Sequence, residues 1–119
     1  MIKKIVLNPN RIRRIPSSFG FIPHRFLTEG FLASLKQQEL VLYWFLILAS
    51  DAKGLSFYNY KTICKLLKLS REDYLQALDG LLAGDLIAFD GTIFQVLELP
   101  LKPVTTSKQS GGEKADGNK

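Results

Sequence analysis

The sequence is poor in the residue types from which most catalytic and metal sites are built. Its 119 residues include one cysteine and one histidine. A lone cysteine excludes a disulfide framework within the chain and a thiolate metal cage, since both need several cysteines. No set of titratable residues forms an acid–base or nucleophile–base pair. The sequence therefore argues against an enzyme and implies no metal, no cofactor and no small-molecule substrate.

Long hydrophobic runs are also lacking. The longest, residues 40–49, has half the ~20 residues that a helix needs to cross a bilayer. The basic start Lys3-Lys4 is followed by Ile5-Val6-Leu7, which is too short for the apolar core of a signal peptide. Residues 1–28 contain no acid, so a transit peptide stays open as an alternative. We predict a soluble, cytoplasmic protein without a membrane partner.

The net charge of +5 is concentrated at the two ends of the chain. Residues 1–30 carry six basic residues against Glu29, whereas residues 31–100 carry six basic and eight acidic residues. Residues 101–119 are basic again, with four lysines against two acids. Basic ends on a nearly neutral body favour a polyanionic partner, most often nucleic acid and occasionally an anionic membrane. The alternative is that basic ends only aid solubility.

Three regions follow from the pattern of proline, glycine and apolar residues. Residues 1–23 contain Pro9, Pro16, Gly20 and Pro23 and should form an extended basic arm. Residues 103–119 have almost no large apolar side chains, which predicts a disordered tail. In the domain between them, residues 24–102, we expect helices over 24–35, 36–50, 59–68 and 70–83, a strand over 55–58, and a hairpin over 86–99. The Asp90-Gly91 pair predicts a two-residue type I′ turn in that hairpin.

This order of elements resembles a winged helix-turn-helix domain, as found in bacterial regulators and in plasmid or phage replication proteins. The resemblance covers about residues 24–101 and is strongest over 55–99. It implies a mainly α fold with a small three-stranded antiparallel sheet. It also implies non-catalytic binding to double-stranded DNA, in regulation of transcription or in replication of a mobile element. In such domains the second helix of the pair, here 70–83, enters the major groove and the hairpin touches the backbone.

The resemblance places the DNA-reading side chains on the helix at 70–83. Arg71 and Gln76 have the chemistry to read guanine and adenine. Glu72, Asp73 and Asp79 would repel phosphates, and they suit a basic protein surface instead. The alternative function is therefore a winged-helix module for protein–protein interaction or dimerisation that does not bind DNA.

Two further groups of basic residues are candidates for contact with DNA phosphates or the minor groove. Lys61, Lys65 and Lys68 have the spacing i, i+4, i+7 of one helix face, although an ordinary solvated face explains them equally well. The arm residues Arg11, Arg13 and Arg14 are typical of arginine arms that enter a minor groove, unless the arm is a disordered leader.

The hydrophobic pattern also predicts the core. The helix at 59–68 should bury Ile63, Leu66 and Leu67, and the helix at 70–83 should bury Leu75, Leu78, Leu81 and Leu82. The helix at 36–50 has no polar side over residues 40–49, so it needs cover on several faces. The preceding helix and the arm residues Phe19, Phe21 and Ile22 would provide that cover within one chain, or a second subunit would provide it in a homodimer.

Overall fold

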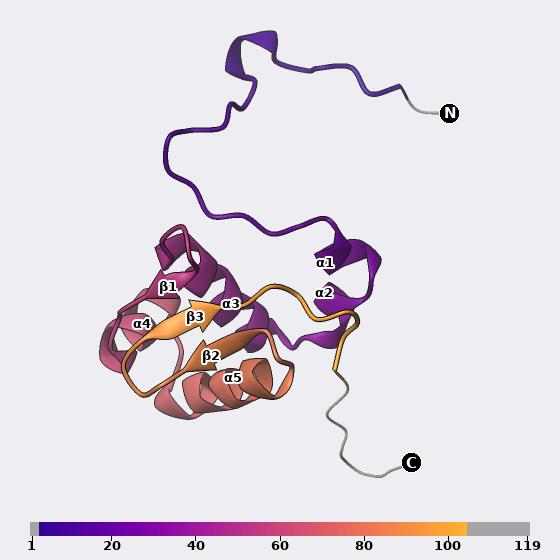
Figure 1. Cartoon of the computed structure of the whole chain (residues 1–119). Helices are drawn as coiled ribbons and strands as arrows, with labels where there is room; N and C mark the ends of the chain where they lie inside the picture. The colour runs from indigo at the N-terminus through magenta and orange to yellow at the C-terminus, as the bar shows by residue number, and fades with distance from the viewer. Residues whose placement is uncertain (1–2, 105–119) are drawn as a thin grey trace.

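The computed structural model describes residues 3–104, which are mainly helical with one small sheet (Figure 1). A single 3-10 turn, η1 (Pro9–Arg11), lies in the N-terminal arm. The other elements follow in chain order: α1 (Arg25–Thr28), α2 (Phe31–Ser34), α3 (Gln37–Ala49), β1 (Leu55–Ser56), α4 (Tyr60–Leu67), α5 (Arg71–Ala83), β2 (Ile87–Phe89) and β3 (Phe94–Val96). The predicted tail lies outside the described residues except for Pro103 and Val104.

The three strands form an antiparallel sheet in the order β1–β3–β2, with β3 in the centre. Leu55 of β1 pairs with Gln95 of β3, and Ile87 of β2 pairs with Val96 of β3. The prediction that the strand near residue 55 joins the later hairpin is therefore confirmed. The strands are shorter than predicted, since β1 ends at Ser56 and β3 at Val96.

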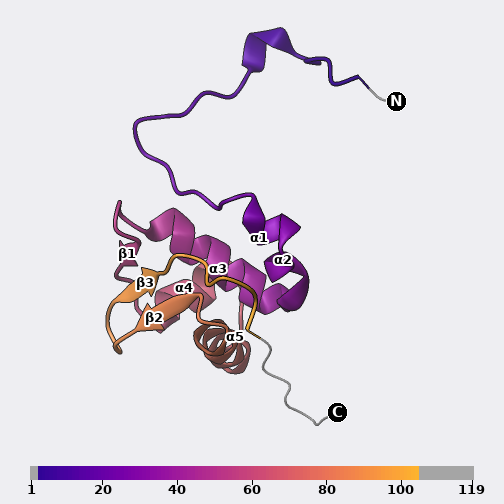
Figure 2. The same ribbon diagram turned by 45° about the vertical axis from the view of Figure 1, so that its right-hand side comes forward.

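The core forms where α3 packs against α5, and the sheet and α4 close it. Figure 2 shows α3 crossing the middle of the body, with α1 and α2 at one end. The side chains buried at these contacts are Leu42, Tyr43, Leu46 and Ile47 of α3, Ile63 of α4, Tyr74, Ala77, Leu78 and Leu81 of α5, and Phe94 of β3. Phe26 and Phe31 of α1 and α2 extend this core, and the Phe26 ring stacks 5.3 Å from that of Tyr43.

Local capping explains where three of the helices begin. The Asn59 side chain accepts a hydrogen bond from the Thr62 N–H at 2.9 Å, and the Ser70 hydroxyl accepts one from the Asp73 N–H at 3.0 Å. At the start of α3, a Glu39 carboxylate oxygen accepts from the Lys36 N–H at 2.8 Å. Such bonds satisfy N–H groups that have no partner within the helix. The predicted starts of all three helices are correct to within one residue.

Other sequence predictions about the helices are wrong. Residues 24–35 do not form one helix, because Gly30 adopts a left-handed conformation with φ of +89° that separates α1 from α2. Leu66, Leu75 and Leu82 are exposed, at 57%, 42% and 38% respectively. The buried stripe of α5 instead has the spacing i, i+3, i+4, i+7 and passes through Tyr74 and Ala77.

The turn between β2 and β3 also differs from the prediction. It spans four residues, since Phe89 pairs with Phe94 and the Asp90 N–H donates to the Ile93 carbonyl oxygen at 3.3 Å. A type I′ turn needs positive φ at both central residues. Here Gly91 has φ of +98°, whereas Asp90 is not among the described residues with positive φ. The Asp90 carboxylate instead accepts hydrogen bonds from the N–H groups of Thr92 at 2.8 Å and Ile93 at 2.7 Å.

The N-terminal arm leaves the body as an extended, exposed segment (Figure 1). Ile22 packs against the core and Gly20 lies against Ile47 of α3, but Phe19 and Phe21 are 58% and 73% exposed. The expectation that both arm phenylalanines cover α3 is therefore wrong. The outer stripe of α3, formed by Val41, Trp44 and Leu48, stays exposed.

The positive φ of Gly91 gives a test of the turn. Gly91→Val should lower the free energy of unfolding by about 1–3 kcal/mol, because a β-branched residue is strained at positive φ. An added Cβ would meet no atom within 4 Å, so the loss would come from the backbone alone. Urea denaturation measures it. Gly91→Asn is the control and should lose less, since asparagine tolerates this conformation. Equal stability of Gly91→Val and wild type would contradict the turn geometry.

The hydrogen bonds to Asp90 give a test by pH. They lower the pKa of this carboxyl below its ordinary value in the folded chain, first through Ile93 and then through Thr92. A lowered folded-state pKa stabilises the protein above the unfolded-state pKa, and that contribution disappears as pH falls through the folded-state value. Between about pH 7 and pH 2, Asp90→Asn should therefore lose less stability than wild type in urea denaturation. An identical acid dependence would show that Asp90 is not held as described.

Candidate nucleic-acid interface

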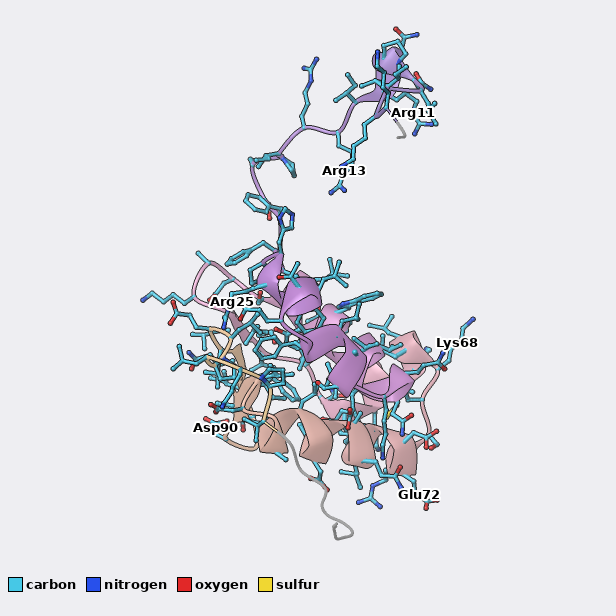
Figure 3. All side chains as sticks on the ribbon, turned by 90° about the vertical axis from the view of Figure 1, so that its right-hand side faces the viewer. Arg11, Arg13, Arg25, Lys68, Glu72 and Asp90 are labelled. Carbon is cyan, nitrogen blue, oxygen red and sulfur yellow. The ribbon has the colours of Figure 1, made fainter. Side chains whose placement is uncertain are left out.

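The arm places three of the predicted DNA-binding residues far from the body. Arg11, Arg13 and Arg14 are exposed, and Arg11 ends the turn η1, which the Asn8 side chain caps by accepting from the Asn10 N–H at 3.1 Å. Figure 3 shows Arg11 and Arg13 projecting from the arm, well separated from the helices. The structure therefore leaves the three guanidinium groups accessible to a partner from several directions.

The lysines predicted to form a stripe on α4 are all exposed, but they do not share one helix. Lys61 and Lys65 lie on α4, which ends at Leu67. Lys68 follows as the C-cap in a left-handed conformation with φ of +58°. The i, i+4 part of the stripe is thus correct. Lys68 instead projects from the junction between α4 and α5 (Figure 3).

The two residues predicted to read bases point to different sides of α5. Arg71 lines a groove on the side of the β2–β3 turn, together with Leu75 and Thr92. Gln76 lines a separate hollow of about 390 Å³ on the side of α3, together with Glu39, Asp79 and Gly80. Residues five apart on a helix differ by about 140° in direction. Arg71 and Gln76 therefore do not form one reading surface.

The groove beside Arg71 is rich in aromatic side chains, and we call it the aromatic groove. It has a volume of about 410 Å³ and lies between the β1–α4 junction, the first half of α5 and the β2–β3 turn. Its lining consists of Phe57, Tyr58, Asn59, Tyr60, Arg71, Tyr74, Leu75, Leu78, Phe89, Gly91 and Thr92. From the sequence, residues 57 and 58 were predicted only to be part of a strand. The signal for the groove was three aromatic residues within positions 57–60.

The walls of the aromatic groove are held by contacts among its own residues. The Arg71 guanidinium lies 5.9 Å from the centre of the Tyr60 ring, and that ring lies 6.3 Å from the ring of Tyr74. Tyr58 meets Phe45 of α3 edge to face at 5.2 Å. Burial raises the pKa of the Tyr74 phenol, so this hydroxyl stays neutral at physiological pH. The groove therefore combines fixed aromatic faces with one cation.

The opposite end of the body is organised around Arg25, which the sequence did not single out. Its guanidinium donates hydrogen bonds to the carbonyl oxygens of Leu99 at 3.2 Å, Pro100 at 2.6 Å and Leu101 at 3.1 Å. It also forms an ion pair with Glu29 at 3.1 Å. Arg25 is thus occupied in holding residues 99–101 against α1 and belongs to the fold rather than to a binding surface.

In comparisons with other proteins, no family model, no curated protein and no solved structure matches this chain. Within residues 3–104, no group of three or more histidine, cysteine, aspartate or glutamate side chains is arranged to hold a metal ion. Among the helices of the same residues, none is long and apolar enough to cross a membrane. The geometry and charge of the surfaces described above are therefore the basis for inferring a function.

Proposed function

We propose that this chain is a winged-helix protein that binds double-stranded DNA without catalysis, in transcriptional regulation or in replication of a mobile element. The order α3, β1, α4, α5, β2, β3, with β1 paired to β3, supports the winged-helix assignment. In this proposal α4 and α5 are the helix-turn-helix and the β2–β3 turn is the wing. The observation that carries the proposal is the exposed basic arm.

The arm suits a phosphate backbone in charge and in reach. Residues 1–30 hold a net charge of +5, equal to that of the whole chain, and the arginines 11, 13 and 14 are exposed. Nine residues lie between Arg14 and His24 at the edge of the body. An extended chain of that length spans about 30 Å, which lets the arm follow a neighbouring groove while the body sits on the duplex. Lys61, Lys65 and Lys68 would add phosphate contacts from the body itself.

The proposed contact between the arm and phosphates predicts how the affinity for DNA depends on salt. In the triple variant Arg11→Ala, Arg13→Ala, Arg14→Ala, the slope of log K against log salt should become shallower by about 2.7, because each neutralised phosphate contributes about −0.9. Fluorescence anisotropy with a mixed-sequence duplex across a salt series measures this slope.

The matched control removes the same charge from elsewhere on the surface, by changing Lys36, Lys53 and Lys102 to alanine. All three are exposed and lie outside the proposed contact. A similar change in slope for both triple variants would mean that net charge alone matters and that the arm makes no specific contact.

A second candidate function, a protein–protein interaction module, is favoured by two surfaces. The first is the outward face of α5, where Glu72 and Asp79 are exposed and would repel phosphates. The second is the exposed stripe Val41, Trp44 and Leu48 of α3, which has no charge and suits contact with a second copy in a homodimer.

Reversal of one acid on α5 separates the two functions. Glu72→Lys should strengthen duplex binding several-fold and make the salt slope steeper by about 0.9, since a repulsive charge becomes a phosphate contact. Glu98→Lys is the control, because Glu98 is also exposed and lies outside α5. The same anisotropy titration measures both. Duplex binding that stays negligible in wild type and in both variants would favour the interaction module.

A further inference from the structure

We propose that the aromatic groove binds a single, unpaired strand of nucleic acid and stacks one of its bases on Phe57. This function goes beyond the binding of duplex DNA proposed above and does not depend on it. Bases within a duplex are stacked on their neighbours, so an open aromatic face is accessible to a base only when the strand is unpaired.

Three aromatic rings of the groove are exposed. Phe57 is 69% exposed, and Tyr58 and Tyr60 are each 41% exposed. Within the described residues, Phe57 is paired with no other ring, whereas Tyr58 meets Phe45 edge to face and Tyr60 lies tilted beside Tyr74. An exposed phenyl group costs free energy in water unless a partner covers it. Three such rings in four consecutive residues form a platform rather than scattered surface residues.

The lining of the groove is positively charged. Among the described residues that line it, Arg71 is the only charged one. A cation beside aromatic faces is the combination that sequence-tolerant single-strand sites use, since the cation meets the backbone and the rings meet the bases. Lys61, exposed on the first turn of α4, adds a second positive charge next to Tyr60.

The acidic residues near the groove do not belong to its lining, so the net charge of the lining stays positive. Glu72 and Asp73 follow Arg71 on α5 but do not line the groove. The Asp90 carboxylate, at the edge of the β2–β3 turn, accepts from the N–H groups of Thr92 and Ile93 and is not among the lining residues. The one lining cation disfavours a basic peptide as the occupant and favours an anionic, aromatic ligand. A nucleotide strand has both properties.

The groove has the size of a ligand site, and its walls are held in place by packing contacts. A volume of about 410 Å³ is within the range of roughly 300–1,000 Å³ typical of ligand sites. The floor consists of the buried residues Tyr74 and Leu78, and the walls are braced by Phe45 through Tyr58 and by Arg71 over Tyr60. A rigid platform loses little conformational entropy when a base stacks on it.

The experiment compares single-stranded and duplex DNA on the full chain. Anisotropy titrations use fluorescein-labelled oligothymidine of 12 nucleotides and a mixed-sequence duplex of 12 base pairs, at about 50 mM salt. We expect Phe57→Ala to weaken oligothymidine binding about 5- to 150-fold, the range for loss of one base–aromatic stack. Duplex affinity should change less than twofold. Phe57→Tyr keeps an aromatic face and should retain the affinity for oligothymidine.

Leu27→Ala is the matched control, because Leu27 is 67% exposed and lies on α1 at the other end of α3. It should leave both affinities unchanged. Since Phe57 is exposed, its replacement should not unfold the chain, and the fluorescence of Trp44, the single tryptophan, reports on the fold of each variant.

The outcomes separate this proposal from the duplex-binding function. Loss of oligothymidine binding in Phe57→Ala, with recovery in Phe57→Tyr, supports the groove whether or not the duplex binds. No binding of oligothymidine to wild type, or equal binding to wild type and Phe57→Ala, overturns the groove and leaves the duplex-binding proposal untouched. Equal weakening of oligothymidine and duplex by Phe57→Ala would also overturn it, because the ring would then act in general binding.

Discussion

The packing of α3 against α5 is the contact on which the other features depend. Four apolar residues of α3 are buried there, and α5 presents the small residue Ala77 toward the core. Gly80 leaves room for the Glu39 side chain, which a Cβ at that position would strike. Because α5 is fixed in this way, its first half forms one wall of the aromatic groove and its second half leads into β2. The β2–β3 turn then closes the groove from the other side.

Charge and aromatic surface are separated in this molecule. The strongest positive charge lies on an exposed, extended arm outside the body, where it can meet phosphates at little cost of desolvation. The exposed aromatic rings lie on the rigid body, where stacking needs fixed geometry. Long-range attraction and short-range stacking thus come from different parts of the chain. In the proposed function, this division would let the arm raise the local concentration of nucleic acid without deciding which form of it the body holds.

The sequence correctly predicted the starts of three helices, because their signals are local. It did not correctly predict every buried side chain, because tertiary packing determines which side chains are buried. Asn59 and Ser70 marked the starts of α4 and α5 correctly because a cap acts on residues two or three positions away. The leucines at 66, 75 and 82 were misplaced because hydrophobicity alone does not define which face of a helix meets the core. Tyr74 and Ala77 occupy that face on α5. The aromatic groove depends on three segments meeting in space, which spacing along the chain does not encode. The separation of Arg71 from Gln76, by contrast, follows from their spacing on one helix.

Arg25 has a mechanical consequence. Its guanidinium ties α1, where the arm enters the body, to residues 99–101, where the described chain leaves it. A pull between α1 and residue 104 would therefore be carried first by these three hydrogen bonds, which join positions 74 to 76 residues apart in the sequence. The sheet, α4 and α5 would bear no load until these three hydrogen bonds had broken. Tension on a bound arm would thus leave the aromatic groove intact while the two ends of the chain begin to separate.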